Sequence, residues 1–140
     1  MKNLLIILLS ILVWNCSSDD NNPQMAIVES TLIAKGNLFG NGEEGISQQN
    51  LVISDQNTWS NLMVQMNTVN NVSYNFTETD IDFSQYTIIA VFNEVKTTGG
   101  HELQLNIMSD TEHITVRVTD LIPERYVTLI ITQPFHIVKI

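Results

Sequence analysis

The sequence has 140 residues, a net charge of −9 at pH 7 and a single cysteine. Its 15 acidic residues outnumber six lysines and arginines, and a field of this sign repels nucleic acid and anionic headgroups. We therefore expect no nucleic-acid partner. A single cysteine also excludes an internal disulfide and a cysteine-based metal site.

The first segment has the pattern of an export signal. Lys2 precedes an apolar run from Leu4 to Val13, which is too short to span a bilayer as a helix. Because Cys16 follows this run, residues 1–15 resemble a bacterial lipoprotein signal peptide, which is removed when the cysteine receives its lipid. The two residues before the cysteine are larger than those usual there. The alternative is an uncleaved anchor whose cysteine has no role.

Residues 16–25 are polar and acidic, which is typical of a solvated tether. A cysteine followed by serines and two acids also resembles the signal that exports some bacterial lipoproteins to the cell surface, and a plain linker is the alternative. We expect a lipid (palmitate) on Cys16 to anchor the chain in the outer membrane, with the domain exposed at the surface. Cleavage would remove Lys2 and no acid, so the mature chain would carry a charge of −10.

Residues 26–140 are expected to form one domain, large enough for a core without disulfides. Its first segment, 26–34, is β-branched and apolar and predicts a strand. A glycine-rich segment follows at 36–45. A phosphate-binding loop would need Gly-Lys-Ser/Thr at the start of a helix, whereas this segment contains Glu43 and Glu44, which would repel phosphate. We expect an irregular loop with several positive-φ positions.

Residues 54–67 predict the main helix, after a short strand at 51–53. Ser54 or Asp55 can cap its first amides. Apolar side chains recur at i, i+3, i+4 and i+7 along one face, at Trp59, Leu62, Met63 and Met66. Such a stripe can form a groove for a partner, but it more often packs on a sheet. We therefore expect it in the core.

A long loop is predicted at 68–80, rich in asparagine and threonine. Asp80, Asp82 and Ser84 offer the oxygen atoms that calcium binds, but the spacing of an EF-hand, with its glycine and distal glutamate, is absent. We expect these residues to form a turn into the next strand.

Three strands are predicted in the second half of the domain. Residues 86–92 are apolar on both faces, which indicates a central strand covered on at least one side by the helix. Residues 101–107 and 113–119 alternate between apolar and polar side chains. They predict half-buried antiparallel strands joined by a tight turn.

A last apolar pair lies at 127–132 and 135–140. Pro134 separates the two segments, and because proline cannot donate to a ladder it predicts a bulge or a bend. The expected fold class is α+β: a curled, mainly antiparallel β-sheet packed against one main α-helix. Gly99 and Gly100 lie between two predicted strands, so we expect them to turn a hairpin.

Three histidines are candidate bases or metal ligands. His101 shares a face with leucines, His113 faces the polar side of its strand, and His136 alternates with Val138 and Ile140. None lies in a His-x-x-His pattern, and no serine lies in a Gly-x-Ser-x-Gly elbow. We expect no enzyme, no cofactor and no metal.

Three motifs in order resemble the C-terminal domain of the protease complex subunit PrcB family. They are Asp82-Phe83-Ser84 before a buried strand, Thr98-Gly99-Gly100 within "KTTGGHELQL", and Pro134-Phe135-His136-Ile137-Val138 within the closing "TQPFHIVKI". With a glycine-rich approach and a tryptophan-bearing helix before them, the likeness runs from about Gly36 to Ile140. Members of the family usually continue into a short proline-containing tail. The resemblance therefore implies that a final strand or extension is missing after Ile140.

The resemblance also implies an accessory lipoprotein. The namesake of the family associates with and stabilises a surface subtilisin-like protease, and the family brings no catalytic or metal residues. It would make the two glycines turn residues of a contact loop, which comprises Thr97, Thr98, Gly99, Gly100 and His101.

Three functions follow from these patterns, in order of preference. The first is a non-catalytic accessory module that binds a protein partner such as a secreted protease through an exposed patch near Phe39, Tyr74, Phe76 or Tyr126. The second is binding of a small molecule or glycan on the concave face of the sheet, through polar groups such as His101, Arg117 and Gln104. The third is a hydrolase, which requires His101 or His136 within hydrogen-bond reach of an acid in a cleft.

Overall fold

A computed structural model describes residues 25–124 and 127–140 of the chain. The predicted signal peptide, Cys16 and nearly all of the predicted tether lie outside these residues, as does Tyr126. Within the described ranges no helix is long and apolar enough to cross a membrane.

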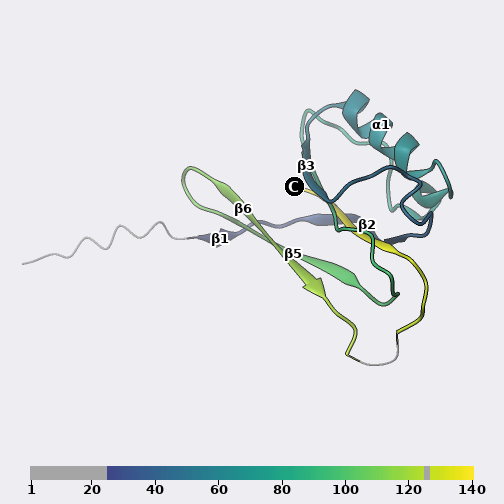
Figure 1. The fold of residues 1–140 in the computed structure, drawn as a ribbon. Coiled ribbons are helices and arrows are strands. Elements are labelled where there is room, and N and C mark those ends of the chain that lie inside the picture. Colours follow the sequence, from purple (N-terminus) through teal and green to yellow (C-terminus); the bar gives the residue numbers. More distant parts are fainter. Residues whose placement is uncertain (1–24, 125–126) are drawn as a thin grey trace, which may run out of the picture.

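The strands form two antiparallel sheets (Figure 1). The large sheet has the spatial order β2–β7–β4–β3, and the small sheet has the order β1–β5–β6. The strands are β1 (Ala26–Ile27), β2 (Thr31–Leu38), β3 (Gln49–Ile53), β4 (Ile88–Phe92), β5 (Glu102–Ser109), β6 (Ile114–Leu121) and β7 (Gln133–Lys139), with helix α1 (Gln56–Met66) and the 3₁₀ turn η1 (Val72–Asn75). The α+β class with one main helix is confirmed, and the strands divide between two sheets where a single curled sheet was expected.

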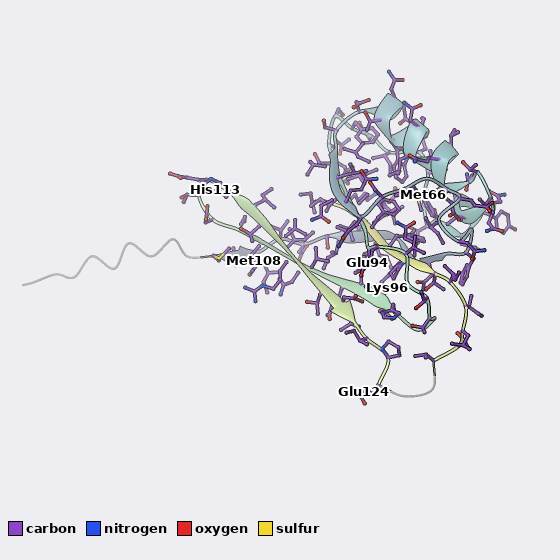
Figure 2. All side chains as sticks on the ribbon, in the orientation of Figure 1. Met66, Glu94, Lys96, Met108, His113 and Glu124 are labelled. Atoms are coloured by element: carbon purple, nitrogen blue, oxygen red, sulfur yellow. The ribbon has the colours of Figure 1, made fainter. Side chains whose placement is uncertain are left out.

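Helix α1 covers one face of the large sheet and forms the first core with it. Asp55 caps the helix, and its side chain accepts a hydrogen bond of 2.9 Å from the N–H of Thr58. Trp59, Leu62 and Met66 are buried against the sheet, as their spacing predicts. The side chains fill the space between the helix and the sheet (Figure 2).

The small sheet covers the opposite face of the large sheet and forms a second core. Buried apolar residues from β4, β5 and β7 meet there, namely Ile89, Val91, Leu103, Ile107 and Val138. Strand β4 lies between the two cores, and all five of its residues are buried. The prediction of a central strand covered by the helix is confirmed, and the small sheet supplies its second cover.

The chain changes sheets three times, after β1, after β4 and after β6, and none of these crossings was expected. The predicted strand 26–34 is divided, because β1 pairs with β5 in the small sheet and β2 pairs with β7 in the large one. The predicted hairpin at Gly99 and Gly100 is wrong, because β4 and β5 belong to different sheets. Residues 93–101 instead carry the chain from one sheet to the other.

Two further predictions about the final segments are wrong. Residues 127–132 form no strand: most are exposed, and only Thr132 makes an isolated bridge, to Lys96. Pro134 marks no bulge, because it pairs with Asn37 in an unshifted register near the start of β7, where a missing N–H is tolerated. The register shift of this strand pair lies at the other end of β2, between residues 32 and 34.

The short connections agree with their sequence patterns. Gly42 and Gly45 of the glycine-rich loop have positive φ, as expected. Asp82 forms a turn, in which its carboxylate accepts hydrogen bonds from both the N–H and the hydroxyl of Ser84. Four residues join β5 to β6, and the Asp110 carboxylate fixes their turn by accepting hydrogen bonds from the N–H groups of Glu112 and His113.

Candidate functional site

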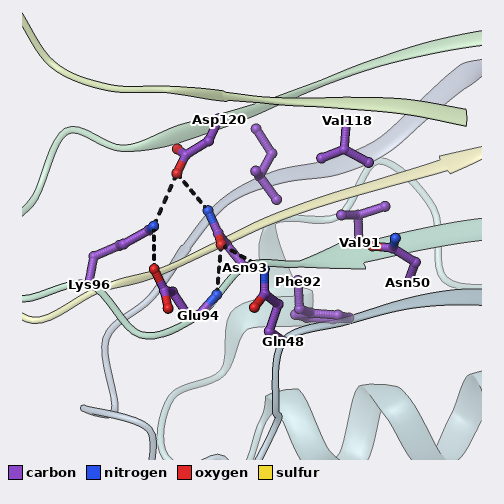
Figure 3. Close-up of a pocket in the computed structure, with 10 residues that line it drawn as sticks. Gln48, Asn50, Val91, Phe92, Asn93, Glu94, Lys96, Val118 and Asp120 are labelled. Carbon is purple, nitrogen blue, oxygen red and sulfur yellow. Dashed lines mark hydrogen bonds and ion pairs between the residues drawn. The ribbon is translucent and has the colours of Figure 1, made fainter.

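A groove of about 420 Å³ lies between the small sheet and one side of the large sheet (Figure 3). β6 forms one wall, and β3 with the end of β4 forms the other. The lining residues are Gln48, Asn50, Val91, Phe92, Asn93, Glu94, Lys96, Leu103, Val118 and Asp120. The groove therefore joins an apolar floor to a polar end.

The groove exists because the small sheet is narrower than the large one. The second core contains residues of β4, β5 and β7 but none of β3. Val52 of β3 pairs with Ile89 and so faces the small sheet, yet its exposed fraction is 75%. Val118, on the inward face of β6, is also 37% exposed. β3 is thus left without a cover on this side.

An ion-pair network closes the polar end of the groove and ties the two sheets together. Lys96 Nζ lies 3.0 Å from Glu94 Oε1 and 3.1 Å from Asp120 Oδ2. Asn93 follows β4 directly, and its Nδ2 donates to the same Asp120 oxygen at 2.9 Å. The carboxylate of β6 is thus held by two side chains of the crossing segment (Figure 3).

Asn93 also orients the neighbouring polar groups. Its Oδ1 accepts from the N–H of Glu94 at 2.8 Å and from Gln48 Nε2 at 3.4 Å. Its backbone is fixed as well, because the carbonyl accepts from the buried Gln133 side chain at 2.9 Å. These bonds hold the amide groups of the groove in a defined arrangement.

The network changes the acidity of its two central groups. Burial works against the charged form of Asp120, but hydrogen bonds from Lys96 and Asn93 outweigh it and hold the pKa of the carboxyl below its usual value. Burial likewise opposes the charge on Lys96, but hydrogen bonds to Glu94 and Asp120 raise its pKa. Both groups therefore stay ionised at neutral pH.

The predicted contact loop, residues 97–101, lies beside the groove and does not line it. Gly99 is buried against the segment before β7: its N–H donates to the carbonyl of Thr128 at 2.9 Å. A Cβ on Gly99 would clash with Thr128 Oγ1, so a larger residue would require the Thr128 side chain to move. Gly100 needs its positive φ of 87°. Thr97 and Gly100 are exposed, and Gly99 is the buried residue of the loop.

His101 connects this loop to the network. Its Nε2 lies 3.1 Å from Thr98 Oγ1, and its Nδ1 faces Asp120 Oδ1 at 3.6 Å. The second distance suits an ion pair but exceeds a hydrogen bond. The Thr98 hydroxyl, the His101 imidazole and the Asp120 carboxylate thus lie in a row, but neither Thr98 nor His101 lines the groove. The array positions Asp120 and the loop relative to each other.

The other two histidines lie apart from the groove. His136 Nδ1 lies 2.8 Å from the carbonyl oxygen of Leu103, so the N–H is on Nδ1 and joins β7 to β5. Burial lowers the pKa of His136, although the bond to Leu103 opposes the shift. His113 lies at the exposed tip of the β5–β6 hairpin, far from Met66 of the helix (Figure 2). Among the described residues, no carboxylate in a cleft lies within hydrogen-bond reach of His136. No group of three His, Cys, Asp or Glu side chains there could hold a metal ion.

The polar residues of the groove were not predicted as a site. Of the ligand-binding group proposed from sequence, Gln104 and Arg117 project from the outer face of the small sheet and do not meet His101. The sequence held one signal for Asp120: it continues the alternation of Val116 and Val118 and so places a charge on an apolar face. Asn93 and Lys96 follow a strand and carry no comparable signal.

The exposed aromatic patch predicted from sequence is only partly present. Phe39 and Tyr74 are exposed. Phe76 is half-buried: it packs on Trp59 at the edge of the first core, with 6.1 Å between the ring centroids, and lines a shallow hollow beside Phe39. The segment before β7 also exposes apolar side chains, including Leu129.

Comparison of the chain with models of protein families, with curated proteins and with solved structures finds no match. The resemblance to the PrcB family therefore stays a prediction, and the function is argued below from the groove.

Proposed function

We propose that the protein is a non-catalytic binding module that holds a protein partner in the groove between β3 and β6. The observation that carries this proposal is the uncovered inner face of β3 next to a fixed polar network. Val52 and Val118 offer apolar surface to a partner, while Asp120 and Glu94 offer charge at one end. Protein interfaces combine these two features, an apolar centre and a polar rim.

The hydrogen bonding at the polar end favours recognition over catalysis. Asp120 Oδ2 is already bonded to Lys96 and Asn93, and its Oδ1 is 3.6 Å from His101. A general base needs free reach toward a substrate in the cleft. Here the Asp120 carboxylate is already bonded between the two sheets, and the His101 imidazole does not line the groove.

We further propose that a lipid on Cys16 anchors the protein to the outer membrane, with the domain at the cell surface. The support is the sequence alone: an apolar run that ends near the only cysteine, followed by a polar segment. The partner would then be an extracytoplasmic protein. A secreted protease is the partner that the PrcB resemblance suggests.

Binding of a small molecule or glycan is the second candidate. The groove has the volume of a ligand site, and the amides of Gln48, Asn50 and Asn93 could bond to hydroxyl groups. It ranks second because Gln48 and Asn93 are bonded to each other, and because the uncovered valines would remain exposed beside a polar ligand.

A photo-crosslinking experiment tests the proposed function. Benzoylphenylalanine replaces Asn50 in the groove or, as a matched control, Asn61 on the exposed face of α1, and the full chain is irradiated in its own cells. We expect one protein adduct from position 50 and none from position 61. The captured protein, once purified, should bind the wild-type chain, and Asn50→Arg should weaken that binding roughly tenfold or more while Asn61→Arg leaves it unchanged.

Two results would overturn the proposal. Adducts from position 61 but not from position 50 would place the binding face on the helix. Saturable binding of a glycan or small molecule to the groove, without any protein adduct from position 50, would replace the proposal with the second candidate.

A further inference from the structure

We propose that the part of the partner that enters the groove is an extended strand, which pairs with the free edge of β6 and carries a lysine or arginine at one end. This inference rests on the proposed function and names the occupant of the same groove.

The outer edge of β6 is long and regular. β6 pairs with β5 through eight residue pairs without a register shift, and nothing within the described residues pairs with its other edge. The strand contains no proline, and its central charge, Arg117, projects from the face opposite the groove. Proteins usually protect such edges with proline, bulges or inward-pointing charges. The one inward charge of β6, Asp120, lies near the end of the strand and is already bonded to Lys96 and Asn93. The rest of the edge lacks these protective features and is suited to the addition of a partner strand.

An added strand would complete the small sheet over β3. Neighbouring strands lie about 4.8 Å apart in any sheet, so a strand beside β6 would lie on the side of the groove, whose other wall includes β3. Val52 of β3 is 75% exposed. Ile114 and Val118 on the inward face of β6 are 56% and 37% exposed. The added strand would cover all three apolar side chains.

The other sheet edges fit a partner strand less well. β2 is already bonded by Thr77, whose N–H donates to the carbonyl of Ile33 at 3.0 Å and whose hydroxyl donates to that of Leu32 at 2.9 Å. β1 has only two residues. A strand bonded to β3 would extend the large sheet sideways and leave Val118 uncovered.

Charge complementarity favours a basic residue at one end of the added strand. Glu94 and Asp120 share the single amine of Lys96, so the polar end of the groove has one carboxylate in excess. The Glu94 side chain is 65% exposed and can be reached from the groove. A second copy of this acidic chain would bring a field of the same sign, which disfavours pairing between two β6 edges. The occupant is therefore a segment of a different protein.

Selection from a phage library of random octapeptides tests the inference, with the full chain in detergent as the target. We expect the enriched peptides to alternate apolar and polar residues and to carry lysine or arginine at one end. Backbone N-methylation then tests pairing directly, because only every second residue of an added strand bonds to the edge. Methylating one alternate set of amides should weaken binding about tenfold or more, and methylating the other set should weaken it less than about threefold.

Matched variants locate the bound peptide. Val52→Lys should weaken binding roughly tenfold, whereas Val64→Lys, at a similarly exposed position on α1, should leave it unchanged. Glu94→Gln leaves Lys96 paired with Asp120 and should weaken binding about two- to fivefold, the effect of one exposed ion pair. Hydrogen exchange of residues 114–121 should slow when the peptide is bound.

Each contrary result has a separate meaning. Equal losses from both methylated sets, or full binding to Val52→Lys, would overturn strand addition. If the chain self-associates and the selected peptides compete with that self-association, the edge of β6 binds a second copy of the chain. If position 50 captures a protein but no alternating peptide is selected, this inference is refuted and the proposed function stands. If position 50 captures no protein and no alternating peptide is selected, both this inference and the proposed function are refuted.

Discussion

Replacing Leu103 by alanine tests the second core, on which the floor of the groove depends. Leu103 is 2% exposed and packs between the sheets, where Leu→Ala changes typically cost about 2.7–5.0 kcal/mol. Leu103 also lines the groove, so water can enter the vacated space and no sealed void remains. We therefore expect a loss near the lower end of the range, about 2.5–3 kcal/mol. Unfolding entropy of about 2.1 cal/mol/K per residue converts this loss into a fall in Tm of about 10 °C for a domain of this size.

The assay is urea unfolding of the wild type, Leu103→Ala and Leu121→Ala, followed by circular dichroism and by the fluorescence of buried Trp59. Leu121 is on the same hairpin, but it is 41% exposed and outside both cores. The same chemical change should cost less than about 1 kcal/mol there. A loss at Leu103 no larger than that at Leu121 would refute the reasoning, because the small sheet would then not be packed on the large one.

The buried Trp59 and the half-buried His136 give further predictions. Trp59→Phe should lower the free energy of unfolding by about 1–3 kcal/mol, because the indole N–H that donates to the Thr79 carbonyl at 2.8 Å is lost and the smaller ring leaves part of the buried Trp59 site unfilled; urea unfolding measures this, and an unchanged midpoint would contradict it. For His136, burial lowers the pKa in the folded state, so its contribution to stability is present above the unfolded pKa of about 6.5 and is lost as pH falls below that value. His136→Asn keeps a donor for the Leu103 carbonyl and should flatten the decline in stability between pH 7.5 and 5.5, whereas a decline equal to that of the wild type would show that another group causes it.

Local patterns predicted the elements of this fold, and non-local pairing decided how they are arranged. The apolar stripe of α1 and the alternation at 101–107 and 113–119 are read from neighbouring residues, and each element formed where the pattern placed it. The division into two sheets depends on which distant strands meet. Residues 127–132 are as apolar as a strand, but apart from the bridge at Thr132 they join no described strand and stay irregular.

The same distinction applies to the candidate site. Asp120 could have been found, since a carboxylate on the inward face of a half-buried strand needs a partner. The identity of that partner could not, because Lys96 and Asn93 reach it only through the path of the crossing segment. The glycines of the contact loop were recognised as a change of chain direction, but the sequence could not show that the chain moves to another sheet there.

The place of β7 in the large sheet has a consequence for the time at which the domain can fold. β7 is the last of the described strands in sequence order, yet it lies between β2 and β4 and bonds to both. A polypeptide emerging from its N-terminus can form α1 and the β5–β6 hairpin from nearby residues, but the two halves of the large sheet have no bridge until the final residues arrive. Non-local closure of this kind is slow, and until it occurs the apolar strand β4 is uncovered and prone to aggregate. The large sheet therefore stays incomplete until residues 133–139 are available, whichever local elements have already formed.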